Sequence, residues 1–191
     1  MRTEKLRRNY DISVRLVHFP LHPETPAEGL SLDKLFGGRA DDEARRARQA
    51  RMKALMDAEG LPYGERTHTY NSRLAQELGK WAETMAGGEA IHDALYRAYF
   101  VDGRNIGDPE TLVAIAQSAR LPSEAASKVL RERSFSQAID EDWAMSRQRG
   151  VTGVPTFAAA GYGVVGAQPY EVLERLVTAA GARSRETATG A

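Results

Sequence analysis

Gly150-Val151-Thr152-Gly153-Val154-Pro155-Thr156-Phe157 is the stretch at which this chain changes from a helical to an extended pattern. The extended pattern continues to Ala159 and, after a turn at Gly161, resumes as Gly163-Val164-Val165-Gly166. Two short extended runs on either side of a glycine turn predict a β-hairpin. Pro155 suits the first position of its strand, because proline has no amide hydrogen to contribute to a ladder.

A block of about one hundred residues before this hairpin is predicted to be helical. Its clearest segment is 72–85, where apolar side chains recur at spacings of three and four residues until the Gly87-Gly88 pair. Another helix is predicted to begin at Asp108-Pro109, because aspartate caps a first turn and proline fits inside it. Further helices are predicted over 41–60, 91–99, 123–130 and 136–149, and a final one after the hairpin from Pro169.

A first strand is predicted over Ile12-Ser13-Val14-Arg15-Leu16-Val17-His18-Phe19, where apolar residues alternate or cluster as in a mostly buried strand. It stops at Pro20, and the prolines at positions 23 and 26 predict a loop that leads away from a sheet. A strand before the helical block and a hairpin after it indicate an α/β fold.

The composition favours one domain and narrows the range of partners. The chain has 191 residues, of which 42% are hydrophobic, with 26 basic and 26 acidic side chains. That size suits one core better than two small ones. Balanced charge creates no field that would favour nucleic acid or an anionic membrane. No apolar run reaches the roughly 20 residues that span a bilayer, and residues 1–8 lack the apolar stretch of a secretory signal, so we predict a cytoplasmic protein without a membrane partner.

The absence of cysteine limits the chemistry of these residues. Without a thiol the chain has no disulfide, no thiolate nucleophile and no zinc-thiolate site. His18 and His22 are four residues apart, but Pro20 lies between them and excludes the helix that would align them, so no metal site is predicted. No phosphate-binding loop or dinucleotide fingerprint is present, and no cofactor is predicted.

Several longer strings resemble the FrnE branch of the DsbA/FrnE oxidoreductase family, which has a thioredoxin-like fold with a large helical insertion. Besides the stretch from Gly150, they are Phe19-Pro20-Leu21-His22-Pro23-Glu24-Thr25-Pro26, Leu95-Tyr96-Arg97-Ala98-Tyr99-Phe100 and Gly103-Arg104-Asn105-Ile106-Gly107-Asp108. The resemblance implies a single DsbA-like domain over 1–181. In it, 1–35 and 151–181 would form the thioredoxin-like part, about 36–150 the all-helical insertion, and 182–191 a flexible tail.

The resemblance also shows what these residues lack. Members of the family open with a strand that runs into a CxxC motif at the start of the first helix. Here the chain begins in what resembles the end of that helix, so strand and cysteine pair are both missing and no catalytic residue is predicted. The family places the missing strand between 12–19 and 154–159, and its loss would expose sheet edges that favour a homo-oligomer. We expect that this sequence is a truncated reading of a longer protein, and not that the remaining strands close up into a smaller sheet.

A substrate-binding edge is implied at the start of the hairpin. In the family the peptide bond before the proline that corresponds to Pro155 is cis, and the backbone of the preceding residue, here Val154, pairs with an extended substrate. Thr152 and Gly153 would shape the approach to this edge. An ordinary proline at the start of a strand is the alternative.

A second part of the binding surface is implied at the entry to the first inserted helix. The string Tyr70-Asn71-Ser72-Arg73 resembles the family's asparagine-containing entry, and Asn71 and Arg73 would line the substrate groove. The alternative is that Asn71 or Ser72 caps the helix, and both roles are compatible.

Three functions are consistent with this pattern. The first is thiol-disulfide exchange on protein substrates. This chain would then be a truncated or redox-inactive form of such an oxidoreductase. The second is a glutathione-dependent reaction, as in 2-hydroxychromene-2-carboxylate isomerase and the kappa-class transferases, where a serine can replace the first cysteine. The third is a non-catalytic module that binds extended peptide at the Val154-Pro155 edge.

Overall fold

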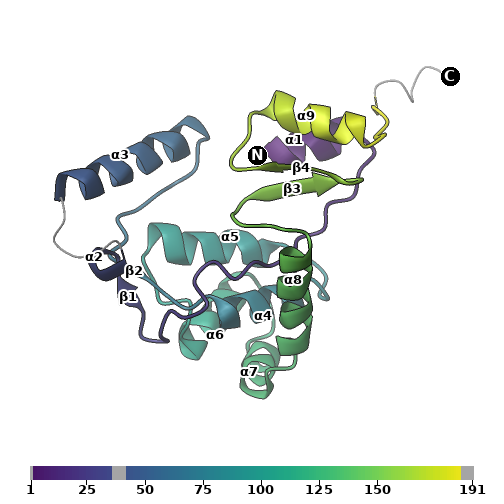
Figure 1. The fold of residues 1–191 in the computed structure, drawn as a ribbon. Helices are drawn as coiled ribbons and strands as arrows, with labels where there is room; N and C mark the ends of the chain where they lie inside the picture. Colours follow the sequence, from purple (N-terminus) through teal and green to yellow (C-terminus); the bar gives the residue numbers. More distant parts are fainter. Residues whose placement is uncertain (1, 36–41, 186–191) are drawn as a thin grey trace. The chain divides into compact units, whose positions relative to one another are not determined.

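The computed structural model describes residues 2–35 and 42–185, and the chain divides into two compact units (Figure 1). Unit 1 comprises residues 1–21 and 142–191, and unit 2 comprises residues 22–141. The sequence predicted the borders of the helical insertion near positions 36 and 150. In the structure, 22–35 instead pack with the helical unit, and the second half of the helix before the hairpin packs with unit 1.

Unit 1 is built on the predicted hairpin, which the structure confirms. β3 (Thr156–Ala159) pairs antiparallel with β4 (Tyr162–Val165), with Thr156 opposite Val165 and Ala159 opposite Tyr162. The two-residue turn has φ values of 46° at Ala160 and 85° at Gly161, and a type I′ turn requires both to be positive.

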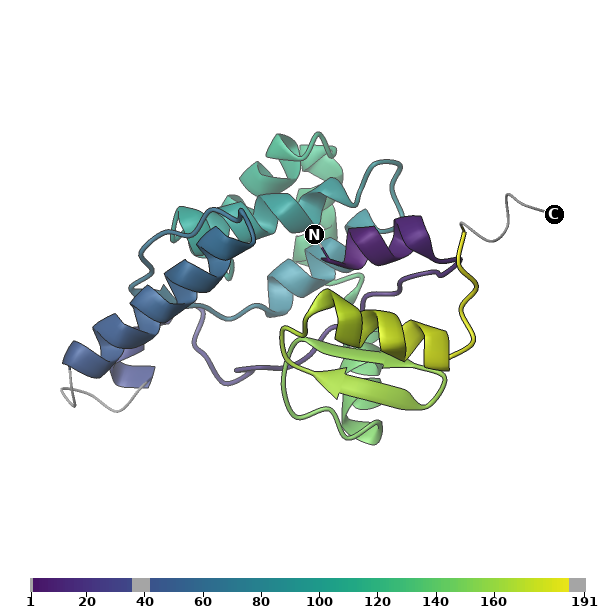
Figure 2. The same ribbon diagram turned by 90° about the horizontal axis from the view of Figure 1, so that it is seen from above.

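Two helices cover one side of this hairpin. α9 (Tyr170–Ala179) packs on both strands and lies over them when seen from above (Figure 2), and it also contacts α1 (Arg2–Asn9). Leu6 from α1 and Leu173 and Val177 from α9 form the buried core of the unit. Burial of these apolar side chains is the main driving force for the packing.

The predicted strand over 12–19 is wrong, because this segment forms no ladder with any described strand. It runs as an extended chain out of α1 (Figure 1). A strand exists only when a neighbouring strand completes its backbone hydrogen bonds, and the apolar alternation alone does not supply that neighbour.

The first residues of the predicted tail are paired with the chain near α1. The amide of Asp11 donates to the carbonyl of Arg183 at 2.9 Å, and the amide of Arg185 donates to the carbonyl of Asn9 at 2.8 Å. Tyr10 and Ser184 form an isolated antiparallel bridge between the same segments. The rest of the predicted tail, 186–191, lies outside the described residues.

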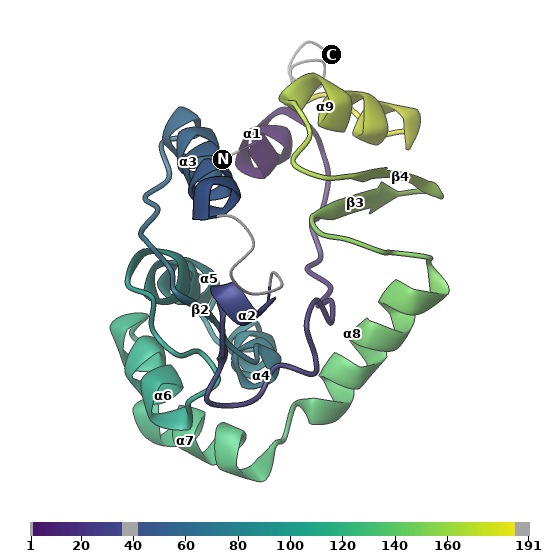
Figure 3. The same cartoon turned by 60° about the vertical axis from the view of Figure 1, so that its left-hand side comes forward.

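Unit 2 contains the predicted helical block. Its helices are α3 (Asp42–Ala58), α4 (Arg73–Ala82), α5 (Ala90–Tyr96), the π-helical turn η1 (Arg97–Val101), α6 (Pro109–Ser118), α7 (Ser123–Glu132) and the first part of α8 (Ser136–Gln148). The predicted start of α3 at position 41 lies outside the described residues. α6 and α7 lie side by side (Figure 3), and both pack on α4 around a core that includes Leu78, Ile91, Leu112 and Ile115.

Three short elements of unit 2 were not predicted. α2 (Leu32–Leu35) is four residues long, and β1 (Leu30–Ser31) and β2 (His68–Thr69) form a pair of two residues each. Segments this short are below the length at which hydrophobic periodicity can be detected. Among the described residues, no helix is both long enough and apolar enough to cross a bilayer.

The predicted cap of α6 is confirmed and can be tested. Asp108 has an extended backbone, and its Oδ2 accepts a hydrogen bond of 2.8 Å from the amide of Thr111. Replacing Asp108 with alanine leaves that amide without its partner, and we expect the free energy of unfolding to fall by about 1 kcal/mol. Urea denaturation followed by circular dichroism measures the loss. Asp108→Asn retains the acceptor and serves as the control, and an equal loss in both variants would contradict the capping role.

Candidate functional site

An open cavity of about 820 Å³ lies in unit 1 beside the hairpin. The extended segment 12–19 lines one part of it and β3 another, and the apolar side chains of α9 contribute Leu173, Leu176 and Val177. Met145, from the C-terminal part of α8, and Arg149, the residue after that helix, also line the cavity. The cavity is therefore mainly apolar and is bordered by two segments of extended backbone.

The edge of β3 that does not face β4 can be assigned from the hydrogen bonds. The amide of Gly166 donates to the carbonyl of Pro155 at 2.7 Å, so Pro155 directs its carbonyl toward the β4 side. In an antiparallel pair, alternate residues direct their backbone groups toward the partner and the others direct theirs away. Thr156 and Ala158 therefore present their carbonyls and amides on the opposite edge, where the described residues offer them no backbone partner, and no described residue forms a backbone hydrogen bond with Val154.

The four site residues predicted at the hairpin are consecutive, but they do not all line the cavity. The Val154-Pro155 peptide bond is cis, as predicted. Val154 and Pro155 line the cavity, and the side chain of Val154 is exposed. Thr152 and Gly153 are not among its lining residues, and the carbonyl of Gly153 accepts a hydrogen bond of 2.6 Å from the Thr156 hydroxyl.

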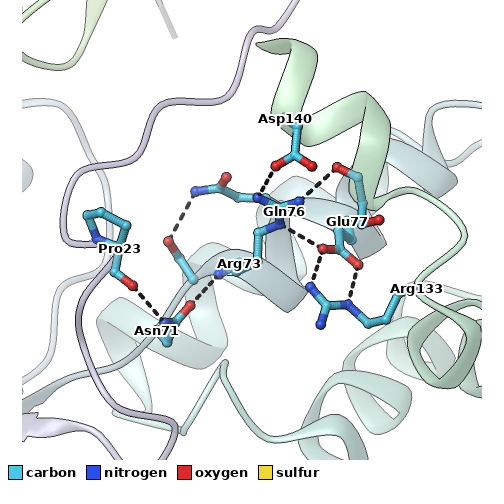
Figure 4. A network of polar contacts seen from close by, with 9 residues as sticks. Pro23, Asn71, Arg73, Gln76, Glu77, Arg133 and Asp140 are labelled. Carbon is cyan, nitrogen blue, oxygen red and sulfur yellow. Dashed lines mark hydrogen bonds and ion pairs between the residues drawn. The ribbon is translucent and has the colours of Figure 1, made fainter. Parts of the chain in front are cut away.

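The two site residues predicted in the helical block lie in unit 2, where Asn71 joins α4 to a preceding loop. Its Nδ2 donates to the carbonyls of Thr25 at 2.7 Å and Pro23 at 3.2 Å, and its Oδ1 accepts from the amide of Arg73 at 2.9 Å (Figure 4). Of the two capping candidates, Ser72 holds the N-cap position of α4 but makes no side-chain cap hydrogen bond, and Asn71 instead accepts from the first amide of the helix. A contact of Asn71 with a substrate stays a prediction.

Arg73 takes part in a network of charged side chains (Figure 4). Its guanidinium donates to Glu77 at 2.7 Å, to Asp140 at 2.8 Å and to the carbonyl of Ser136 at 2.8 Å. All three acceptors belong to unit 2. Because Ser136 and Asp140 are in α8, the Arg73 side chain links α4 to the start of α8. A role in lining a substrate groove stays a prediction for this residue as well.

Glu77 is the buried centre of this network, and the sequence analysis missed it. Arg133 donates to both of its carboxylate oxygens, at 2.8 and 2.6 Å, in addition to the bond from Arg73. Burial by itself would raise the pKa of Glu77, but the hydrogen bonds from Arg133 and Arg73 outweigh it and lower the pKa below its usual value. The four-residue spacing of Arg73 and Glu77 was the available sequence signal, since such pairs meet on one helix face.

His18 and Asp142 anchor the end of the extended segment. The buried carboxylate of Asp142 interacts with Nδ1 of His18 at 3.0 Å and accepts from the amide of His18 at 3.2 Å. The Ser146 hydroxyl donates to the carbonyl of His18 at 3.2 Å. In the part of the chain that the structure describes, no group of three or more acidic or histidine side chains is arranged to hold a metal ion.

The fold and the hairpin agree with the comparisons with known proteins. Residues 1–178 match the model of the DSBA-like thioredoxin domain, and the chain belongs to this family. A solved structure of a "probable DsbA oxidoreductase" from Streptomyces coelicolor is 31% identical, with a TM-score of 0.76 over 84% of this chain and 71% of that one. A 2-hydroxychromene-2-carboxylate isomerase has 19% identity and a TM-score of 0.67 over 94% of this chain and 85% of that one, which shows a shared fold. No curated protein matches the chain.

Proposed function

We propose that this chain binds an extended segment of another polypeptide at the free edge of β3, and that it acts as a DsbA-like domain for polypeptide recognition. The observation that carries the proposal is the set of unpaired backbone groups at Val154, Thr156 and Ala158 beside an apolar cavity. An exposed strand edge of this kind binds peptides by adding a strand, because main-chain hydrogen bonds supply affinity for many sequences. Thr152 and Gly153 precede this edge and border the approach to it.

Disulfide exchange is not part of the proposed activity of these 191 residues. Exchange requires a thiolate that attacks a disulfide sulfur, and the chain contains no cysteine. The purified chain should therefore reduce insulin disulfides with dithiothreitol no faster than dithiothreitol alone. A faster rate would contradict the assignment. The glutathione-dependent alternative stays a prediction, because the shared fold with the isomerase carries no residue roles.

The proposed binding edge is tested with a permanently unfolded polypeptide. Fluorescein-labelled, reduced and carboxymethylated ribonuclease would be titrated with the chain, and binding followed by fluorescence anisotropy. Ala158→Pro removes the amide hydrogen on the free edge, where proline is tolerated because no ladder bond to β4 is lost. We expect the dissociation constant to rise about tenfold, the equivalent of one to two backbone hydrogen bonds.

Ala158→Ser is the matched control, since the Ala158 side chain is exposed and serine retains the amide. A second measurement does not depend on the fold of a variant. Two short apolar peptides would be N-methylated at alternate residues, one at the odd positions and the other at the even positions. One of the two should bind more weakly than the unmodified peptide. Binding at this edge would be refuted if Ala158→Pro bound the labelled polypeptide as tightly as the wild-type chain does, and if both methylated peptides bound as tightly as the unmodified peptide.

A further inference from the structure

Arg66 of unit 2 has a positive charge that no described residue neutralises. Its side chain is half-buried just before β2, and it forms no ion pair with any acidic side chain in the described part of the chain. The neighbouring Glu65 is exposed. Arginine stays protonated in proteins, and a charge that is partly removed from water is normally paired. Arg66 therefore lacks the negative partner that its burial calls for.

Two aromatic rings of η1 fix the orientation of this guanidinium. Its Cζ lies 4.5 Å from the centre of the Tyr99 ring and 5.0 Å from the centre of the Phe100 ring. Its Nη1 donates to the Tyr99 hydroxyl, which in turn donates to Oγ1 of Thr69 at 3.3 Å. The contacts with the rings and this chain of hydrogen bonds hold the guanidinium in place through Nη1 alone.

The other two donor groups, Nε and Nη2 of Arg66, are left without a partner. Nε is shielded from solvent, yet it makes no hydrogen bond in the described part of the chain. Nη2 has no described acceptor either, but it is not shielded. A shielded donor without a partner is unfavourable, and such groups normally find one. Nε and Nη2 form one edge of the planar guanidinium, which suits two parallel hydrogen bonds to a carboxylate.

The rings under Arg66 belong to an aromatic cluster, which comprises Tyr99, Phe100, Tyr63 and Tyr96. The ring centres of Tyr96 and Tyr63 lie 5.2 and 6.3 Å from that of Phe100, and all four side chains are half-buried. Flat rings that stay partly in water beside a cation suit a ligand that has an apolar part.

The backbone under this cluster is also unusual. The amide of Asp102 donates to the carbonyl of Arg97 at 3.0 Å, a step of five residues that makes η1 a π-helical turn. Such turns are rare and are frequent at functional sites.

We infer that the edge of Arg66 formed by Nε and Nη2 binds the carboxylate of a ligand whose flat apolar group rests on the aromatic cluster. The carboxylate would first meet Nη2, and the side chains that shield Nε would then move aside. Small aromatic acids and polypeptides with a C-terminal aromatic residue both have this combination of groups. The site lies within unit 2, so the inference goes beyond the proposed function and does not rest on it.

NMR spectroscopy of the whole chain tests the site directly. The signal of the Arg66 Nε–H group is identified by its absence from the spectrum of Arg66→Lys. Titration with benzoate at constant ionic strength should shift this signal in a saturable way. Acetate has the carboxylate but no ring, and we expect it to bind about fivefold more weakly, the equivalent of one aromatic contact. This measurement on the wild-type chain does not depend on the folding of a variant.

Three variants test the role of the guanidinium. Arg66→Gln removes the charge and the two-donor edge, and the dissociation constant for benzoate, followed through the backbone amides of η1, should rise about tenfold. Arg66→Lys retains the charge but not the edge and should be weakened to a similar extent. Arg97→Gln is the matched control, because Arg97 is exposed and paired with Asp93 at 2.7 Å, and its affinity should stay within about twofold of wild type.

The last arm of the experiment distinguishes the two sources of the carboxylate. A glycine-serine peptide that ends in phenylalanine is compared in its free-acid and amidated forms. Tighter binding of the free acid than of benzoate would identify a polypeptide C-terminus, and binding of benzoate alone would identify a small acid. The inference is overturned if benzoate does not shift the Arg66 signal, if inorganic phosphate or acetate binds as tightly as benzoate, or if Arg66→Gln and Arg97→Gln bind alike.

Discussion

Replacing Glu77 with glutamine is expected to lower the free energy of unfolding by about 3 kcal/mol. The carboxylate is fully buried and receives hydrogen bonds from Arg73 and Arg133 at 2.6 to 2.8 Å. Glutamine keeps the shape but removes the charge, and its amide group presents donors where the two guanidinium groups need acceptors. The loss would be measured by urea denaturation of the whole chain, followed by the fluorescence of Trp81 in a Trp143→Phe background.

The same residue should make stability depend on acid pH. The pKa of Glu77 is lowered in the folded chain relative to its usual 4.5, because the arginine hydrogen bonds outweigh the effect of burial. A lowered pKa means that the carboxylate stabilises the fold fully above pH 4.5 and that this contribution is lost as the pH falls through the folded-state value. The wild-type chain should therefore lose more stability than Glu77→Gln on acidification below pH 4.5.

Glu83→Gln is the control for both measurements. Glu83 follows α4, is exposed, and lies 3.6 Å from Lys80, so its loss should change stability by less than about 0.5 kcal/mol. If Glu77→Gln were as stable as Glu83→Gln at pH 7, the charged network would not hold α4, α7 and α8 together.

Replacing Leu173 with alanine is expected to cost about 3 kcal/mol of the stability of unit 1. Leu173 lies in the small core between α9, α1 and the hairpin, and few other side chains are available there to fill the space left by the three missing side-chain carbons. Unfolding would be followed through Trp143, the tryptophan of unit 1, in a Trp81→Phe background.

Leu21→Ala removes the same atoms from an exposed position of the same unit and should cost less than about 0.5 kcal/mol. A similar effect of the two replacements would show that α9 is not held to the hairpin by its apolar face.

Most of the helices could be predicted because their signals are local. The apolar spacing in α4 and the Asp108 cap with Pro109 in α6 depend on residues within one or two turns of each other. The hairpin was predictable for the same reason, since its turn occupies the two residues Ala160 and Gly161. At the candidate site, Val154 and Pro155 could be named because they belong to this local signal and to a family string.

The contacts that join distant segments could not be predicted. Glu77 and Arg133 are 56 residues apart, and nothing near either one indicates the other. β1 and β2 are recognised as strands only because Leu30 lies opposite Thr69. Arg149 and Leu16 line the same cavity, and this could not be predicted either, because it depends on the path of the chain between them.

The helices, the hairpin and the absence of a thiol in these residues could therefore be established from the sequence alone, because they depend on neighbouring residues or on composition. Tertiary structure alone decided the state of 12–19, whose apolar alternation is that of a strand. Whether such a segment becomes a strand depends on a neighbour that completes its hydrogen bonds. In the described chain that neighbour is absent, and the same residues form one side of an open cavity.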